Sequence, residues 1–204
     1  MPFVVGAPRS GTTLLRFMLE SHPLLAIPPE TGFLPAVAGL EQAGKTGPDD
    51  LLQVLTGTPA NAPNWSDFLL DAEELRTELG AIPEFTLTKG VRAFYRLYAR
   101  KHNKPRYGDK TPLYCEYLDV IESLVPEAHF IHIIRDGRDQ ALSIRKTWFA
   151  PGPDVESLAL YWRRLVRTCR ESGRNVAAYM EVRYEDLIRE PRPVLERICR
   201  FIKL

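Results

Sequence analysis

FVVGAPRSGTTLL, residues 3–15, is the stretch of sequence that decides the fold of this chain. Residues 3–5 are an apolar run typical of a buried strand, and residues 14–20 have the apolar spacing of an amphipathic helix. Gly6 and Gly11 bracket the loop between them. Such a loop directs successive backbone N–H groups at an anion, and the helix N-terminus adds partial positive charge. We therefore predict a phosphate-binding loop.

The loop departs from the nucleotide-triphosphatase pattern at one position. The Walker A motif requires a lysine after its second glycine, and this chain has Thr12 there, with Arg9 as the cation of the loop. A tight strand-to-helix turn without a ligand is the alternative. However, two glycines, a proline, an arginine and several hydroxyl residues exceed what a turn needs. The loop therefore suits a phosphate-like group and lacks the lysine that reaches the β- and γ-phosphates.

Composition bounds the class of protein. At 204 residues, of which 45% are hydrophobic, we expect a single domain over residues 1–204. The formal net charge of +1 is too small to indicate binding to nucleic acid or to a membrane surface. No apolar run has the length of a membrane span, and a first strand at residue 3 leaves no room for a signal peptide. Three scattered cysteines without a CxxC pair predict reduced thiols and a cytoplasmic location.

Helical and strand patterns alternate along the rest of the chain. Residues 33–102 are mostly helical and separate the first strand from the next convincing one, as a lid or substrate-side insertion would; within them, Asp49 is a predicted helix cap. Residues 112–124 are predicted as one helix opened by a proline, and residues 128–134 as the clearest buried strand. Strands joined by helical crossovers predict an α/β fold whose parallel sheet has helices on both faces.

Charged residues follow two of the later strands, where open α/β sheets hold their ligands. Lys110 and Asp109 end a short strand; the alternative is a solvated turn, with Asp109 or Thr111 as the cap of the next helix. Arg135 ends the clearest strand and Ser143 lies two turns into the following helix, a pair that suits a second phosphate unless Arg135 pairs with a neighbouring acid. Glu30 follows two prolines and is either held near the loop or a first-turn acid of the next helix.

These strand ends predict a ligand with two separate anionic groups. The parts needed for ATP hydrolysis are missing from the sequence, since neither the Walker lysine nor a metal-binding aspartate at a strand end is evident. A donor held by cations and backbone amides, without a metal, fits the residues better.

Three motifs resemble those of the PAPS-dependent sulfotransferases. Residues 8–13, PRSGTT, are similar to the loop that binds the 5′-phosphosulfate in that family, and residues 135–143, RDGRDQALS, are similar to its 3′-phosphate motif. Residues 183–187, RYEDL, resemble its C-terminal signature, in which the tyrosine, here Tyr184, lies near the nucleotide. Because the motifs occur in the family's order over residues 3–202, the resemblance implies the P-loop-type sulfotransferase fold with PAPS as the donor.

A closer likeness is to the tyrosylprotein-type and bacterial branch, whose loop also carries arginine and continues into a helix similar to residues 15–23. The catalytic glutamate of that branch lies in a Glu-Thr pair that matches Glu30-Thr31, and its second catalytic cation matches Lys110. The resemblance thus favours a catalytic Glu30. Bacterial enzymes with these motifs sulfate many hydroxyl compounds, and the tyrosylprotein enzymes are membrane-anchored Golgi proteins. The acceptor therefore stays open among small molecules, carbohydrates and peptides.

The resemblance also implies a mechanism of in-line sulfuryl transfer. Glu30 would take the proton of the acceptor hydroxyl, while Arg9 and Lys110 would stabilise the charge that develops. No metal is expected. The residues implied to bind the nucleotide are Arg9, Ser10, Gly11, Thr12 and Thr13 at the 5′-phosphate, Arg135 and Ser143 at the 3′-phosphate, and Tyr184.

The sequence departs from the family at its end. Family members usually continue into a basic, glycine-containing loop that closes over the nucleotide, whereas this chain stops at Leu204. A catalytically silent PAP-binding module is therefore one alternative. A P-loop kinase or other phosphotransferase is a second, although it needs a metal and the missing lysine. Residues 33–102 and the pair Trp148-Phe149 are expected to line the acceptor pocket.

Overall fold

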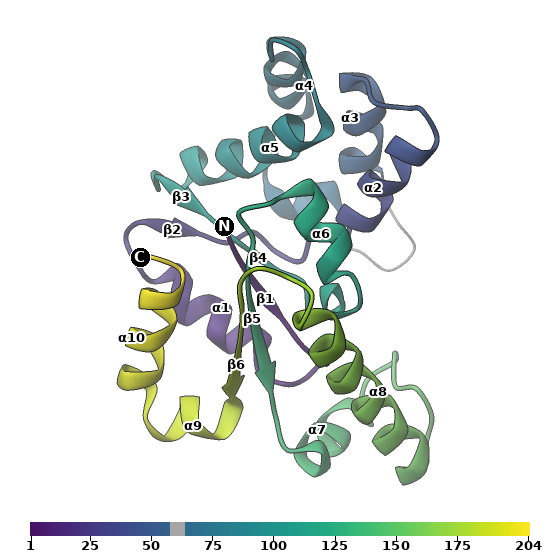
Figure 1. Cartoon of the computed structure of the whole chain (residues 1–204), viewed down its shortest axis with the longest axis vertical. Helices are drawn as coiled ribbons and strands as arrows, with labels where there is room; N and C mark the ends of the chain where they lie inside the picture. The colour runs from purple at the N-terminus through teal and green to yellow at the C-terminus, as the bar shows by residue number, and fades with distance from the viewer. Residues whose placement is uncertain (58–63) are drawn as a thin grey trace.

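The computed structural model describes residues 1–57 and 64–204 (Figure 1). At its centre lies a four-stranded sheet with the order β4-β1-β5-β6, in which every neighbouring pair is parallel. Because β1 pairs with both β4 and β5, the strand that precedes the predicted loop occupies an inner position. The strands are β1 (Pro2–Val5), β4 (Asp109–Lys110), β5 (His129–Ile134) and β6 (Tyr179–Arg183), and a separate parallel pair is formed by β2 (Leu25–Ala26) and β3 (Arg106–Tyr107).

Both faces of the sheet are buried. Phe3 and Val5 belong to the core on one face and Val4 to the core on the other, and none of the three is exposed. Successive side chains of a strand point to opposite faces, so a continuous apolar run needs helices on both sides. The predicted fold class is confirmed. The covering helices are α1 (Thr12–Glu20), α9 (Tyr184–Arg189) and α10 (Pro191–Phe201) on the Val4 face, and α6 (Leu118–Leu124) and α8 (Val155–Gly173) on the other.

Residues 33–102 are mostly helical, as predicted. One cap differs from its prediction, because α3 begins after Gly47, whose N–H donates to Asp50 Oδ2 at 3.1 Å. Pro48 occupies the first helical position, which moves the start of the helix ahead of Asp49 and removes that residue from the cap. The elements of this part are α2 (Leu34–Gln42), α3 (Pro48–Thr56), the 3₁₀ helix η1 (Trp65–Phe68), α4 (Ala72–Gly80) and α5 (Leu87–Lys101).

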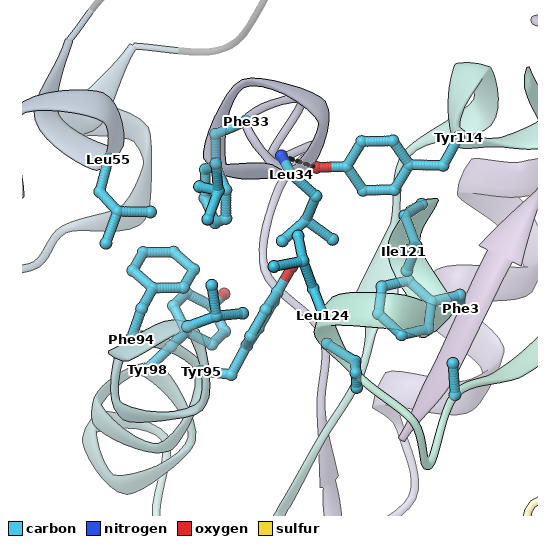
Figure 2. Close-up of a cluster of buried hydrophobic side chains, with 14 of the residues drawn as sticks. Phe3, Phe33, Leu34, Leu55, Phe94, Tyr95, Tyr98, Tyr114, Ile121 and Leu124 are labelled. Atoms are coloured by element: carbon cyan, nitrogen blue, oxygen red, sulfur yellow. Dashed lines mark hydrogen bonds between the residues drawn. The ribbon is translucent and has the colours of Figure 1, made fainter. Parts of the chain in front are cut away.

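Buried side chains of this helical part belong to the same core cluster as Phe3 of the central sheet (Figure 2). The ring of Phe94 packs edge to face against Phe33 at a centroid distance of 5.1 Å and against Phe68 at 5.2 Å, the geometry that aromatic quadrupoles favour. Figure 1 shows α3, α4 and α5 at the end of the molecule away from α7 (Gly137–Ile144). The helical part therefore shares one continuous core with the sheet while projecting beyond it.

The predicted single helix over residues 112–124 is two elements, the 3₁₀ helix η2 (Pro112–Glu116) and α6. The break lies at Tyr117, whose φ of −137° is far from helical values. Just before the break, the buried hydroxyl of Tyr114 accepts a hydrogen bond from the backbone N–H of Leu34 at 3.0 Å (Figure 2). This contact with a residue 80 positions away holds Tyr114 in place next to the break. Among the described residues, no helix is both long and apolar enough to cross a bilayer.

Candidate functional site

Only glycine can occupy the two positions that bracket the loop between β1 and α1. Gly6 and Gly11 have φ values of 149° and 96°, which L-residues rarely adopt. A Cβ at Gly6 would lie 2.5 Å from the carbonyl oxygen of Ile133, and one at Gly11 would lie 2.3 Å from the ring of Tyr184. Both glycines are thus required because β5 and Tyr184 approach the loop closely. Arg9, at the turn of the loop, also has a positive φ, of 69°.

Two long-range hydrogen bonds hold the loop in place. Gln140, fully buried on α7, donates from Nε2 to the carbonyl oxygen of Pro8 at 2.8 Å. On the other side, the N–H of Gly6 donates to the carbonyl oxygen of Pro112 at 3.1 Å. Sequence reasoning missed Gln140, because a single polar residue within a charged motif carries no local sign of burial.

The loop also offers hydrogen-bonding capacity that the protein itself leaves unused. The hydroxyl of Ser10 is buried, and within the described part of the chain it has no hydrogen-bond partner. A buried hydroxyl without a partner is costly, and this one lies just before the N-terminus of α1, where an oxyanion is favoured. The residues of the loop therefore fit a phosphate or sulfate group. Thr12 is buried and Thr13 is exposed in the first turn of the helix.

Arg135, Ser143 and Tyr184 all lie beside the loop, although they come from β5–α7 and α9. The guanidinium carbon of Arg135 is 4.7 Å from the centroid of the Tyr184 ring, a cation–π geometry. Arg135 Nη1 donates to the carbonyl oxygen of Arg9 at 3.3 Å, and Arg9 Nε donates to Ser143 Oγ at 3.2 Å. The residues predicted for the two anion sites thus form one continuous cluster.

Arg138, rather than Arg135, neutralises the neighbouring acid. Its guanidinium binds both carboxylate oxygens of Asp136, at 3.0 and 2.7 Å, and these hydrogen bonds hold the pKa of Asp136 well below its usual range. Across residues 1–57 and 64–204, no carboxylate forms an ion pair with Arg135, and its Nε is buried without a partner. The local pairing considered from the sequence is therefore wrong, and the charge of Arg135 is available to an anion.

A lysine and a glutamate meet at the first turn of α1. Lys110, buried on β4, donates from Nζ to Glu30 Oε1 at 2.6 Å, and the side chain of Glu30 is 42% exposed. The same Nζ lies 3.5 Å from Thr13 Oγ1. The predicted catalytic residues Glu30 and Lys110, which are 80 positions apart, therefore adjoin the predicted anion-binding loop.

Buried polar side chains anchor the segment that carries Glu30. The hydroxyl of Thr31 donates to Asp109 Oδ2 at 2.7 Å, and that of Tyr95 donates to the same oxygen at 2.8 Å. The N–H of Thr31 donates to Thr111 Oγ1 at 3.0 Å. Asp109 is thus neither a helix cap nor a solvated turn residue. Its partners are 78 and 14 positions away, so no local pattern reveals its role.

Burial makes the charge of Asp109 costly and raises the pKa of this carboxyl from 3.8 to about 6, against the effect of its hydrogen bonds and of Lys110. The folded state therefore holds this proton more tightly than the unfolded state, and Asp109 destabilises the fold increasingly as the pH rises from about 4 to about 6. Over that range, Asp109→Asn is expected to gain up to about 3 kcal/mol of unfolding free energy relative to wild type. Urea denaturation of both proteins from about pH 4 to pH 7 measures this difference, and parallel stability curves would contradict it.

A wide cavity opens at the Glu30–Lys110 pair and has a volume of about 600 Å³. Three of its lining residues lie at positions 66–69, so the helical part between residues 33 and 102 does reach the site. Trp148 and Phe149 do not line this cavity: they pack on each other between α7 and α8, and Trp148 is 86% exposed. The lining residues are Arg16, Pro29, Glu30, Ser66, Asp67, Leu69 and Lys110.

Comparison with known proteins identifies a family for this chain. The model of the sulfotransferase family matches residues 3–204. Protein-tyrosine sulfotransferase 1 of Danio rerio is 27% identical over 213 residues, which cover 99% of this chain and 52% of that protein. The nodulation protein NoeE of Sinorhizobium fredii is 32% identical over 152 residues, which cover 73% of this chain and 32% of that protein. This chain thus spans about half the length of the Danio relative.

Solved sulfotransferase structures have a similar fold. The sulfotransferase domain of the Synechococcus PCC 7002 olefin synthase superposes with a TM-score of 0.60 at 27% identity, covering 100% of this chain and 73% of that domain. The sulfotransferase domain from the curacin biosynthetic pathway has a TM-score of 0.66 at 21% identity, covers 100% of this chain and 74% of that one, and supports the fold alone. Because the family model extends over residues 3–204, this chain belongs to the sulfotransferase family.

Proposed function

We propose that this chain transfers a sulfuryl group from PAPS to a hydroxyl of an acceptor and releases PAP. The observation that carries the proposal is the 2.6 Å contact between Glu30 and Lys110 beside Thr13 at the start of α1. A carboxylate able to accept a proton and an ammonium able to stabilise negative charge thereby lie next to an anion-binding loop. Membership of the sulfotransferase family supports the same class of reaction.

Two adjacent anion sites support PAPS as the donor, which when bound supplies the sulfuryl group and a 5′-phosphate leaving group. The loop amides with Ser10, Thr12 and Thr13 hold the 5′-phosphate at the N-terminus of α1. Arg135, by its planar fork, and Ser143, by its hydroxyl, hold the 3′-phosphate. Tyr184 lies under the guanidinium of Arg135 and so orients it beside the nucleotide.

The chemistry needs one proton acceptor and positive charge. Glu30 accepts the hydroxyl proton of the acceptor as its oxygen forms the new bond to sulfur and the bond from sulfur to the 5′-phosphate oxygen breaks. The electron pair of the broken bond stays on that phosphate oxygen, where Lys110 and Arg9 stabilise it. The cations of the chain supply the positive charge of this scheme, so it calls for no metal ion.

The acceptor is proposed as a small molecule, a carbohydrate or a peptide with a free hydroxyl. The similarity to a protein-tyrosine sulfotransferase supports including tyrosyl peptides among the compounds to be tested. A P-loop kinase is not favoured, because the family model covers residues 3–204 and the loop lacks the Walker lysine. The cytoplasmic location stays a prediction.

Transfer of ³⁵S from labelled PAPS to a panel of phenols, sugars, lipids and tyrosyl peptides tests the proposal. We expect a labelled product from at least one class of acceptor, and calorimetric binding of PAP in preference to ATP with Mg²⁺. Binding of PAP without transfer to any acceptor would identify a catalytically silent PAP-binding module. Preferential, Mg²⁺-dependent binding of ATP would instead favour a phosphotransferase.

A further inference from the structure

We propose that Asp109 is a positioning residue, which through Thr31 sets the distance between Glu30 and Lys110. The inference rests on the proposed function, because it takes Glu30 as the base, and it extends that function to a residue outside the three sulfotransferase motifs. Asp109 touches neither the anion-binding loop nor the cavity. Any effect of Asp109 on catalysis must therefore act through its neighbours.

The segment that carries Glu30 needs such an anchor. Residues 27–33 lie between β2 and α2 and belong to no helix or strand, so no ladder of backbone hydrogen bonds fixes them. The ion pair of Glu30 with Lys110 is a weak substitute, because the Glu30 side chain is 42% exposed and water competes for exposed ion pairs. The buried hydrogen bonds of the next residue, Thr31, are what hold the segment against the sheet.

The hydroxyl hydrogen bonds around Thr31 run in one direction and end at Asp109. The Tyr114 hydroxyl accepts from the N–H of Leu34 at 3.0 Å (Figure 2). Because Thr31 donates its only hydroxyl proton to Asp109 at 2.7 Å, the contact of 2.7 Å between Thr31 and Tyr114 requires Tyr114 to donate. Tyr95 donates to the same carboxylate oxygen. An ionised carboxylate that only accepts is thus the end point of a chain in which every proton is assigned.

Two parallel contacts join the same two segments. Thr31 follows Glu30 directly in the chain, and Asp109 directly precedes Lys110 on β4, whose register with β1 is fixed. Since successive side chains of a strand point to opposite faces, Asp109 faces the core and Lys110 faces the site. The buried contact Thr31–Asp109, 2.7 Å long, therefore lies alongside the exposed contact Glu30–Lys110, 2.6 Å long.

The buried contact is the one that persists during the reaction. When Glu30 accepts a proton it becomes a neutral acid, and the ion pair with Lys110 is reduced to a weaker hydrogen bond from an ammonium group to a neutral oxygen. Asp109 takes no part in proton transfer and keeps its hydrogen bonds to Thr31 and Tyr95. The position of Glu30 is thereby independent of its own charge, which favours the return of the base to the same place after each turnover.

Replacing Thr31 with valine tests the proposal, because it removes the hydroxyl while keeping the shape of the side chain. In Thr31→Val we expect kcat for ³⁵S transfer to fall on the order of 10²-fold, with an unchanged dissociation constant for PAP. Thr31→Ser keeps the hydroxyl and is expected to keep kcat close to the wild-type value. The matched control is Tyr95→Phe, which removes a hydrogen bond from the same carboxylate oxygen but leaves the segment of Glu30 attached, and is expected to keep kcat close to wild type. Thr31→Ala removes the same hydroxyl if the valine variant does not fold.

Crystal structures of these variants give a readout that does not depend on turnover. In Thr31→Val, Glu30 Oε1 is expected to leave hydrogen-bonding distance of Lys110 Nζ, whereas Tyr95→Phe keeps that contact. An intact contact in the valine variant would overturn the proposal, as would equal losses of kcat in the valine and phenylalanine variants. If the wild-type chain transfers sulfate to no acceptor, the proposed function fails, and the structural comparison still decides whether Asp109 and Thr31 position Glu30.

Discussion

Replacing Glu30 with glutamine is expected to reduce kcat for sulfuryl transfer about 10²- to 10⁴-fold, the range typical of loss of a general base. Glutamine has the same shape, and its amide oxygen still accepts the hydrogen bond that Lys110 donates at 2.6 Å. It cannot accept the proton of the acceptor hydroxyl. The affinity for PAP should stay close to the wild-type value, because the Glu30 side chain pairs with Lys110 and not with the residues proposed to bind the two phosphates. Initial rates with labelled PAPS and calorimetry with PAP measure the two quantities.

Glu20→Gln is the matched control for this variant. Glu20 forms an ion pair of 3.3 Å with Arg16, a residue that lines the same cavity, and does not contact Lys110. The control removes the same charge from the neighbourhood of the site and is expected to turn over at nearly the wild-type rate. Wild-type turnover in Glu30→Gln would exclude Glu30 as the base. Similar losses in both variants would assign the effect to the general charge of the site.

Replacing Arg135 with alanine is expected to weaken the binding of PAP about 10- to 150-fold, because charge-assisted hydrogen bonds contribute about 1.5–3 kcal/mol. The affinity for AMP, which has no 3′-phosphate, should change far less. The comparison of the two ligands is needed because Arg135 also packs on the ring of Tyr184. Any loss that comes from a displaced Tyr184 would affect both ligands alike. Calorimetric titrations of the variant with PAP and with AMP separate the two effects.

Arg138→Ala serves as the control in the same motif. The side chain of Arg138 is 90% exposed and pairs with Asp136, so its removal changes the net charge by the same amount without touching the cluster of Arg9, Ser143 and Tyr184. Because its removal also leaves the Asp136 carboxylate without its partner, we expect losses of PAP and AMP affinity that are small compared with the loss of PAP affinity in Arg135→Ala. Equal losses of PAP and AMP affinity in Arg135→Ala would contradict the role of Arg135 at the 3′-phosphate.

The sequence by itself determined the fold class and most of the cluster that we propose binds the nucleotide. The apolar run at residues 3–5, the two glycines and the charged end of β5 are local signals, because strand periodicity and positive φ angles depend on a few neighbouring residues. The predicted cap at Asp49 was wrong because Pro48 occupies the first helical position, so that the helix begins before Asp49.

Only the tertiary structure decided how the proposed catalytic pair, Glu30 and Lys110, is held. From the residues alone, Glu30 was compatible both with a role in the site and with a position in the first turn of a helix. Asp109 was compatible both with a ligand-binding role and with a helix cap. Their partners are 80 and 78 positions away, and a buried carboxylate is tolerated only where such partners satisfy it. Gln140 and Tyr114 also form hydrogen bonds with residues far away in the sequence. Tyr114 lies just before the break in the helix that was predicted over residues 112–124. Local patterns thus determined which elements form, whereas long-range hydrogen bonds to buried polar groups decided which side chains meet at the site.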